Sequence, residues 1–156
     1  MLWHIFVRSH VVPSIGLKVT FSAEIVAHTP GTDPGRLIQG CYGPAFSYLS
    51  PTDPCDMPYQ QTVLEGQQAG VVLNMINFET GQLFDWFISG NKAFALIERL
   101  PTVVTGNPGT GLDLAYTQII REVDIKAGKK QRVAIRYSRG PDASFVEYFL
   151  NGELFA

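Results

Sequence analysis

Residues 71–101 read VVLNMINFETGQLFDWFISGNKAFALIERLP and form the most densely apolar stretch of the chain. Tight-turn residues interrupt this stretch twice, at Thr80-Gly81 and at Gly90-Asn91. Apolar runs separated by such short turns favour antiparallel hairpins. The stretch therefore predicts a three-stranded meander at the middle of a β-sandwich.

The second turn determines which side chains share a face of this meander. If Gly90-Asn91 is a two-residue loop, Ser89 pairs with Lys92, and each opposed pair farther along follows from it. Because side chains alternate along a strand, one face is predicted to hold Leu83, Asp85, Phe87, Phe94, Leu96 and Glu98. The other face holds Phe84, Trp86, Ile88, Ala93, Ala95 and Ile97. A preceding loop of two or four residues adds Asn74 to the Asp85 face, whereas a three-residue loop removes it.

Asp85 and Glu98 are the candidate catalytic residues. On an apolar face an unpaired carboxylate is costly to bury, and two neighbouring carboxyls raise each other's pKa, which suits acid/base chemistry. Asn74 is the candidate hydrogen-bond partner that orients them or a ligand. The structural alternative is a buried ion pair between one of the acids and an arginine, with Arg99, Arg121 and Arg136 as the available partners.

Five aromatic residues are further candidates for a ligand site: Phe87, Phe94, Trp86, Tyr137 and Tyr148. The alternative for Trp86 is that it fills the sandwich core opposite Ala93 and Ala95. The two tyrosines are equally consistent with ordinary amphipathic positions in a sandwich.

Alternating apolar and polar residues predict strands elsewhere in the chain, at 3–8, 17–28, 112–126, 131–138 and in a hairpin over 144–156. The hairpin is centred on Asn151-Gly152, a strong turn signal. Helix remains an alternative for part of 112–126, whose apolar residues fit neither period. Residues 29–68 contain six prolines, which predicts an ordered loop without regular elements, either a lid over a sheet face or a clamp on a sheet edge.

The composition predicts a single globular domain over residues 1–156, because 46% of the 156 residues are hydrophobic and 17% are charged. A net charge of −2 does not indicate a surface that binds nucleic acid or an anionic membrane. There is no apolar run of about 18 residues and no signal peptide, so a cytoplasmic protein is expected unless the N-terminus is truncated. The three histidines and two cysteines lack metal-ligand spacing, so neither a metal nor a cofactor is predicted, and the pairing of Cys41 with Cys55 is left open.

The last residues, RVAIRYSRGPDASFVEYFLNGELFA (132–156), resemble the closing strands of concanavalin A-like lectin/glucanase and laminin-G-like jelly rolls. The central ETGQLFDWFISGNKAFALIERLP (79–101) is similar to a microbial and fungal family of that fold whose function is poorly defined. The resemblance covers roughly residues 17–156 and implies two packed, curved antiparallel sheets with a concave face that often carries the site. It implies no single function, since the fold hosts lectins, glycosidases, lyases and non-catalytic modules. The Glu-x-Asp-x-Glu strand of the glucanase members is absent here.

The sequence thus predicts an all-β, antiparallel two-sheet jelly-roll sandwich of the concanavalin A-like class, truncated at the termini. Its predicted function is that of a small-molecule enzyme or binding protein. The Asp/Glu pair would perform isomerase, cyclase or hydrolase chemistry on a largely apolar ligand. The alternatives are a carbohydrate-binding or glycan-processing module, and a non-catalytic interaction domain that forms a homodimer through a sheet edge.

Overall fold

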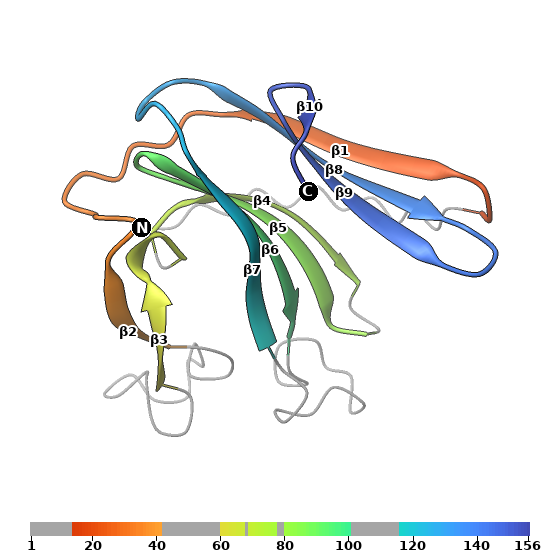
Figure 1. The fold of residues 1–156 in the computed structure, drawn as a ribbon, viewed down its shortest axis with the longest axis horizontal. Coiled ribbons are helices and arrows are strands. Elements are labelled where there is room, and N and C mark those ends of the chain that lie inside the picture. Colours follow the sequence, from red (N-terminus) through yellow and green to blue (C-terminus); the bar gives the residue numbers. More distant parts are fainter. Residues whose placement is uncertain (1–13, 42–59, 68, 78–79, 101–115) are drawn as a thin grey trace.

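The computed structural model describes residues 14–41, 60–67, 69–77, 80–100 and 116–156 (Figure 1). Ten β-strands and a short 3-10 helix lie in these ranges. The strand predicted at 3–8 and the pairing of Cys41 with Cys55 fall outside what is described. None of the helical structure in these ranges has the length and apolar character needed to cross a membrane.

One sheet is built from the two ends of the described chain. It has the antiparallel order β1-β8-β9-β10, with β1 Lys18–Ile25, β8 Gln131–Arg139, β9 Ser144–Leu150 and β10 Glu153–Leu154. The predicted hairpin turn is confirmed, because Leu150 opposes Glu153 and the two residues between them have positive φ, 54° at Asn151 and 93° at Gly152. Glycine adopts this backbone conformation readily and asparagine tolerates it.

The second sheet is the predicted meander with one more strand. Its order is β4-β5-β6-β7, with β4 Val71–Asn77, β5 Gln82–Ser89, β6 Lys92–Arg99 and β7 Tyr116–Asp124. Ser89 opposes Lys92, and Asn77 opposes Gln82, so the two loops have two and four residues. The register predicted from Gly90-Asn91 is confirmed. Of the two loop lengths that put Asn74 on the Asp85 face, the four-residue loop is found, and it places Asn74 opposite Asp85.

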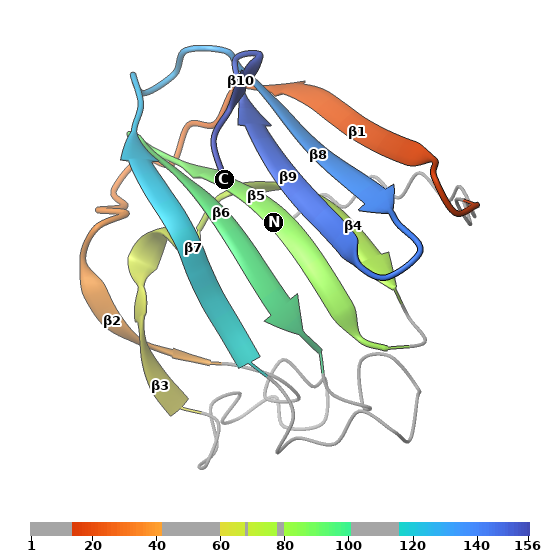
Figure 2. The same cartoon turned by 45° about the vertical axis from the view of Figure 1, so that its right-hand side comes forward.

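The two sheets pack face to face, as the separate groups of strands in Figures 1 and 2 show, and this confirms an all-β two-sheet sandwich. The core between them is lined by Ile25, Ala27, Trp86, Ile88, Ala93, Ala95, Val133, Ile135 and Tyr148. Two hydrogen bonds cross this core in opposite directions. The Trp86 indole donates to the Ala134 carbonyl over 3.0 Å, and the Tyr148 hydroxyl donates to the Leu96 carbonyl.

The prediction that residues 29–68 lack regular structure is wrong. Strands β2 (Leu37–Cys41) and β3 (Gln60–Leu64) form a two-stranded antiparallel sheet, and the 3-10 helix η2 (Glu65–Gln67) follows. All six prolines of this region fall outside these elements. Proline blocks a strand only where its missing N–H is needed, so a high proline content between the strands did not prevent their pairing.

The β2–β3 unit is attached to the second sheet at its Phe94 end. Both carboxylate oxygens of Glu65 accept from the Arg36 guanidinium, at 2.8 and 3.0 Å, which closes the base of the unit. Gly66 lies directly on the Phe94 ring and on Pro34: a Cβ at Gly66 would be 2.8 Å from the ring. This region of the chain therefore covers one end of the sheet face that points away from the first sheet.

Strand β7 contains a β-bulge. Ala95 opposes Arg121 but the next residue, Leu96, opposes Ile119, so Ile120 is an extra residue in β7. A bulge shifts side-chain alternation by one position, which explains why this segment fits neither period in the sequence. The described part of the predicted 112–126 strand is a strand, and the helical alternative is wrong there; residues 112–115 are outside the described ranges.

Candidate functional site

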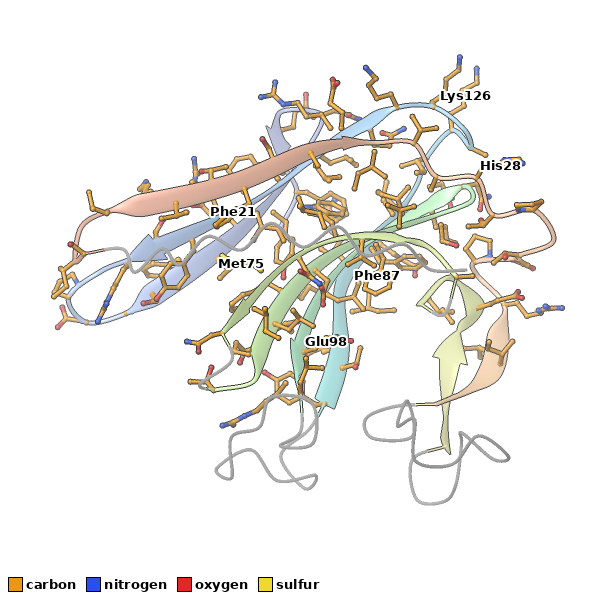
Figure 3. The ribbon with its side chains drawn as sticks, turned by 180° about the vertical axis from the view of Figure 1, so that it is seen from behind. Phe21, His28, Met75, Phe87, Glu98 and Lys126 are labelled. Carbon is orange, nitrogen blue, oxygen red and sulfur yellow. The ribbon has the colours of Figure 1, made fainter. Side chains whose placement is uncertain are left out.

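The candidate site lies on the face of the β4–β7 sheet that is turned away from the first sheet. In Figures 1 and 3 this sheet arches, and the face in question is on its hollow side; it is called the hollow face below. Figure 3 shows Phe87 and Glu98 pointing to the hollow side, while Met75 points toward the other sheet. Two rows of opposed residues cross the hollow face: Asn74, Asp85, Leu96 and Ile119, and beside them Ile76, Leu83, Glu98 and Thr117.

Asp85 is the most deeply buried acidic residue at this site, with 1% of its surface exposed. Neither of its carboxylate oxygens accepts a hydrogen bond from a donor in the described part of the chain. An ionised carboxylate in such surroundings is strongly disfavoured, and the group becomes neutral instead. Burial, together with the neighbouring Glu98, raises the pKa of Asp85 to about 9.

Glu98 is half-buried, and the Thr117 hydroxyl donates to its Oε1 over 2.8 Å. Burial raises the pKa of Glu98, while the Thr117 hydrogen bond and the neighbouring Asp85 carboxyl act against that rise. Asp85 is therefore the acid that keeps its proton, and Glu98 is the one whose carboxylate the Thr117 hydroxyl stabilises.

The three arginines considered as ion-pair partners lie elsewhere. Arg136 forms a two-pronged ion pair with Glu147 on the first sheet, and Arg121 donates to the Phe155 carbonyl and stacks on the Phe155 ring. Arg99 follows Glu98 directly in β6, so its side chain leaves the opposite face of the strand. Among the described residues, the charge that acts on the Asp85 carboxyl comes from Glu98.

The structure brings three of the other predicted site residues to the hollow face. Asn74 is exposed and opposes Asp85 across β4 and β5. Phe87 is half-buried in the neighbouring row and opposes Phe94, which is completely buried beneath the β2–β3 unit. Phe87 and Asn74 thus remain accessible beside the acids, whereas Phe94 is covered and cannot contact a ligand directly.

The structure separates the remaining three aromatic candidates from the acids. Trp86 and Tyr148 are 0% and 1% exposed in the core between the sheets, and their rings meet edge to face. For Trp86, the core position that the sequence left as an alternative is the one found. The prediction that Trp86 and Tyr148 line a ligand site is therefore wrong for both residues. Tyr137 lies on the inner face of the first sheet, where its hydroxyl donates to Ser144.

Thr117 is a member of the site that the sequence did not indicate. Counting back from Asp124 by strict alternation assigns Gln118 to the row of Glu98, and only the bulge at Ile120 brings Thr117 there instead. The broken alternation of residues 116–124 was the one available signal. Among the described residues no three His, Cys, Asp or Glu side chains gather as metal ligands would.

An open groove elsewhere in the described structure does not include the acids. It runs along the first sheet between Leu17 at the start of β1 and Phe145 on β9, with Leu154 at its edge. The pair of carboxyls is thus on a different sheet from this groove.

Comparison with known proteins identifies a family but no function. No curated protein matches the chain, and no solved structure matches it either. Residues 53–155 match a family of unknown function, DUF6081. The matched region contains both sheets except for β1, and it includes Asn74, Asp85, Glu98 and Thr117. The chain therefore belongs to the DUF6081 family.

Proposed function

We propose that the protein binds a neutral, largely apolar small molecule on the hollow face and performs acid/base chemistry on it with the Asp85–Glu98 pair. One observation carries the proposal: two neighbouring carboxyls lie on a largely apolar sheet face, and within the described ranges no arginine acts on either of them. Perturbed titration combined with a specific partner is typical of functional sites. Structural carboxyls are more commonly paired with a cation.

The geometry favours different roles for the two acids. Glu98 is half-buried and would be the group that meets the ligand, whereas Asp85 is enclosed behind it. Glu98 would accept a proton from one ligand atom and return it to another, which is a balanced isomerisation or cyclisation that needs no co-reactant. Asp85 would keep its own proton and stabilise the Glu98 carboxylate between the two transfers. With water as the nucleophile, the same pair would support a hydrolase: Glu98 would take a proton from the attacking water and return it to the leaving group.

The surroundings support a neutral apolar ligand over a sugar or an anion. Apart from Asn74 and Thr117, the residues next to the acids on the hollow face are apolar: Ile76, Leu83, Phe87, Leu96 and Ile119. An anionic ligand would meet an uncompensated negative charge on the pair.

The proposal also includes membership of the concanavalin A-like class. Two packed antiparallel sheets, one of them arched with acids on its hollow side, support it. This class places many of its sites on the concave face, as the resemblance of residues 17–156 implies. The function itself rests on the side chains and not on the fold.

The test combines ligand binding with proton exchange. Neutral cyclic ketones and alcohols of about six to ten carbons are screened by thermal shift beside the carboxylates of the same skeletons, at sizes that suit a small apolar site. We expect the neutral compounds to raise the melting temperature and the carboxylates to have no effect. For a ketone that binds, α-proton exchange with deuterated water is followed by NMR, and the protein is expected to accelerate it.

Glu98→Gln should abolish the exchange while the protein stays folded, because the amide cannot accept the proton. Glu122→Gln is the matched control, since Glu122 belongs to the same face but is paired with Lys92. The proposal fails if no neutral compound binds, or if Glu98→Gln and Glu122→Gln exchange protons equally well.

A further inference from the structure

We propose that Thr117 is a positioning residue that fixes the shared proton on Asp85 and keeps Glu98 as the base, and that the bulge at Ile120 puts it there. This inference deepens the proposed function and rests on it for its catalytic meaning. The location of the proton itself can be measured without any ligand.

The two acids differ in one respect that decides where the proton resides. Glu98 Oε1 accepts from the Thr117 hydroxyl at 2.8 Å, whereas Asp85 accepts from no donor in the described chain. A hydrogen bond donated to a carboxylate favours the ionised form, and such charge-assisted bonds are stronger than neutral ones. Without Thr117 the acids would be separated only by their difference in burial.

The bulge determines which residue of β7 reaches Glu98. On one side of Ile120 the residue on the hollow face is Glu122, opposite Phe94; on the other side it is Ile119, opposite Leu96, and then Thr117, opposite Glu98. In an unbroken strand continuing from Glu122, Gln118 would oppose Glu98 and Thr117 would point to the other face. Bulges recur next to functional sites because they redirect a side chain in this way.

The charged and polar groups that face the pair come from every strand of the sheet. Strand β4 contributes Asn74, which is neutral, and β7 contributes Thr117. From the first sheet, the Tyr148 hydroxyl reaches the backbone of Leu96 and Asp85. The next charges on the same face are Glu122, two rows from Glu98, and Lys92 and Asp124, three rows away; Lys92 is paired with Glu122 and with Asp124. Thr117 is thus the neutral donor that contacts Glu98 directly, and among the described residues its hydroxyl makes no hydrogen bond to the Asp85 carboxyl.

The test is a titration of the two side-chain carboxyls by NMR in protein labelled with ¹³C at the Asp and Glu carboxyl carbons. In the wild type we expect Glu98 to be ionised at a pH at which Asp85 is still protonated. Thr117→Val, which keeps the shape and removes the donor, should shift the titration of Glu98 upward and bring the two curves together. Thr117→Ser, which keeps the hydroxyl, should restore the separation.

Gln118→Ala is the matched control, because Gln118 is exposed on the opposite face of the same strand, and both curves should stay unchanged. The inference is overturned if Asp85 ionises before Glu98 in the wild type, or if Thr117→Val leaves the titration of a folded protein unaltered. If Thr117→Val does not fold, the wild-type order and the Thr117→Ser titration still decide. Because no ligand is used, failure of the inference is distinct from failure of the proposed function, which the exchange experiment decides.

Discussion

Asp85 combines near-complete burial with the absence of any described donor to its oxygens. A protein tolerates such a residue only if the side chain is neutral when folded. The proton is therefore part of the native structure at this position. It follows that the stability of the fold must depend on pH through this residue.

We predict that the free energy of unfolding falls as the pH rises from about 4 to about 9. The folded pKa of Asp85 is raised from 3.8 to about 9, so its contribution is fully present below the unfolded pKa and is lost as pH approaches the folded one. One proton corresponds to a slope of at most about 1.4 kcal/mol per pH unit. Glu98 acts in the same direction. Urea unfolding at a series of pH values measures the profile.

Asp85→Asn is the decisive variant for this profile, because the amide imitates the neutral acid and can still donate to Glu98. The free energy of unfolding of this variant should change less with pH across this range. The variant should also be more stable than the wild type at alkaline pH. A wild type whose stability is constant between pH 5 and 8, or an Asp85→Asn variant with the same slope, would contradict the prediction.

The Tyr148 hydroxyl on the first sheet donates one of the two hydrogen bonds that cross the core to the second sheet. We predict that Tyr148→Phe costs about 1–3 kcal/mol, because the buried Leu96 carbonyl loses a donor that it accepts from across the core. Tyr137→Phe is the control: its hydroxyl meets the exposed Ser144, and its loss should cost much less. Denaturant unfolding of the two variants side by side makes the comparison, and equal losses would refute it.

At the scale of elements, the contact between η2 and β6 attaches the β2–β3 unit to the hollow face. We predict that Gly66→Ala destabilises the protein by about 1–3 kcal/mol, since its Cβ would lie 2.8 Å from the Phe94 ring and 2.9 Å from Pro34. Gly35→Ala tests the same segment without the clash, because its Cβ meets the flexible end of Lys92 at 3.2 Å.

Thermal unfolding followed by circular dichroism distinguishes the two glycine variants. Gly66→Ala should melt clearly below the wild type and Gly35→Ala close to it. If both variants melt with the wild type, then η2 does not press on Phe94, and the β2–β3 unit is not fixed to the sheet in the way described.

The elements that could be predicted from the sequence are those whose turns are encoded locally. Gly90-Asn91 and Asn151-Gly152 fix the register of their hairpins, and from the first of these registers the shared face of Asp85 and Glu98 follows correctly. The sequence allowed a loop of two or four residues before β5, so it placed Asn74 on the face of Asp85 but did not pair the two. Strands β2 and β3 were missed because their partner lies across a long proline-rich connection, so no local turn signals the pairing.

The site was predictable to the same extent and for the same reason. The two acids come from strands joined by a short turn, whereas Thr117 comes from β7, which follows β6 after a longer connection and contains an extra residue. Whether Trp86 faces a ligand or the core depends on what packs against its face of the sheet. The alternation of residues along β5 does not reveal this. Long-range packing is therefore what the sequence pattern leaves undetermined.

For the whole molecule, the order of the strands predicts where it is most resistant to opening. Among the described strands, β5, β6 and β8 have neighbours along both sides, β9 has the two-residue β10 on one side, and β1, β4 and β7 are at sheet edges. Local opening requires less energy at edges than in the centre. We predict that the slowest amide hydrogen exchange occurs in β5, β6 and β8, and NMR-detected exchange measures it. Slowest exchange in the β2–β3 unit would contradict this architecture.

The bulge in β7 has one more consequence, which concerns the behaviour of many copies in solution. Strand β7 is the outer strand of its sheet among the described strands, and its Ile120 and Tyr116 side chains are exposed. A regular strand of this kind offers a template on which another molecule can add its own strand, and so begins aggregation. The extra residue breaks that template into two short segments out of phase with each other. The same irregularity that brings Thr117 to Glu98 thus discourages the protein from polymerising along this edge.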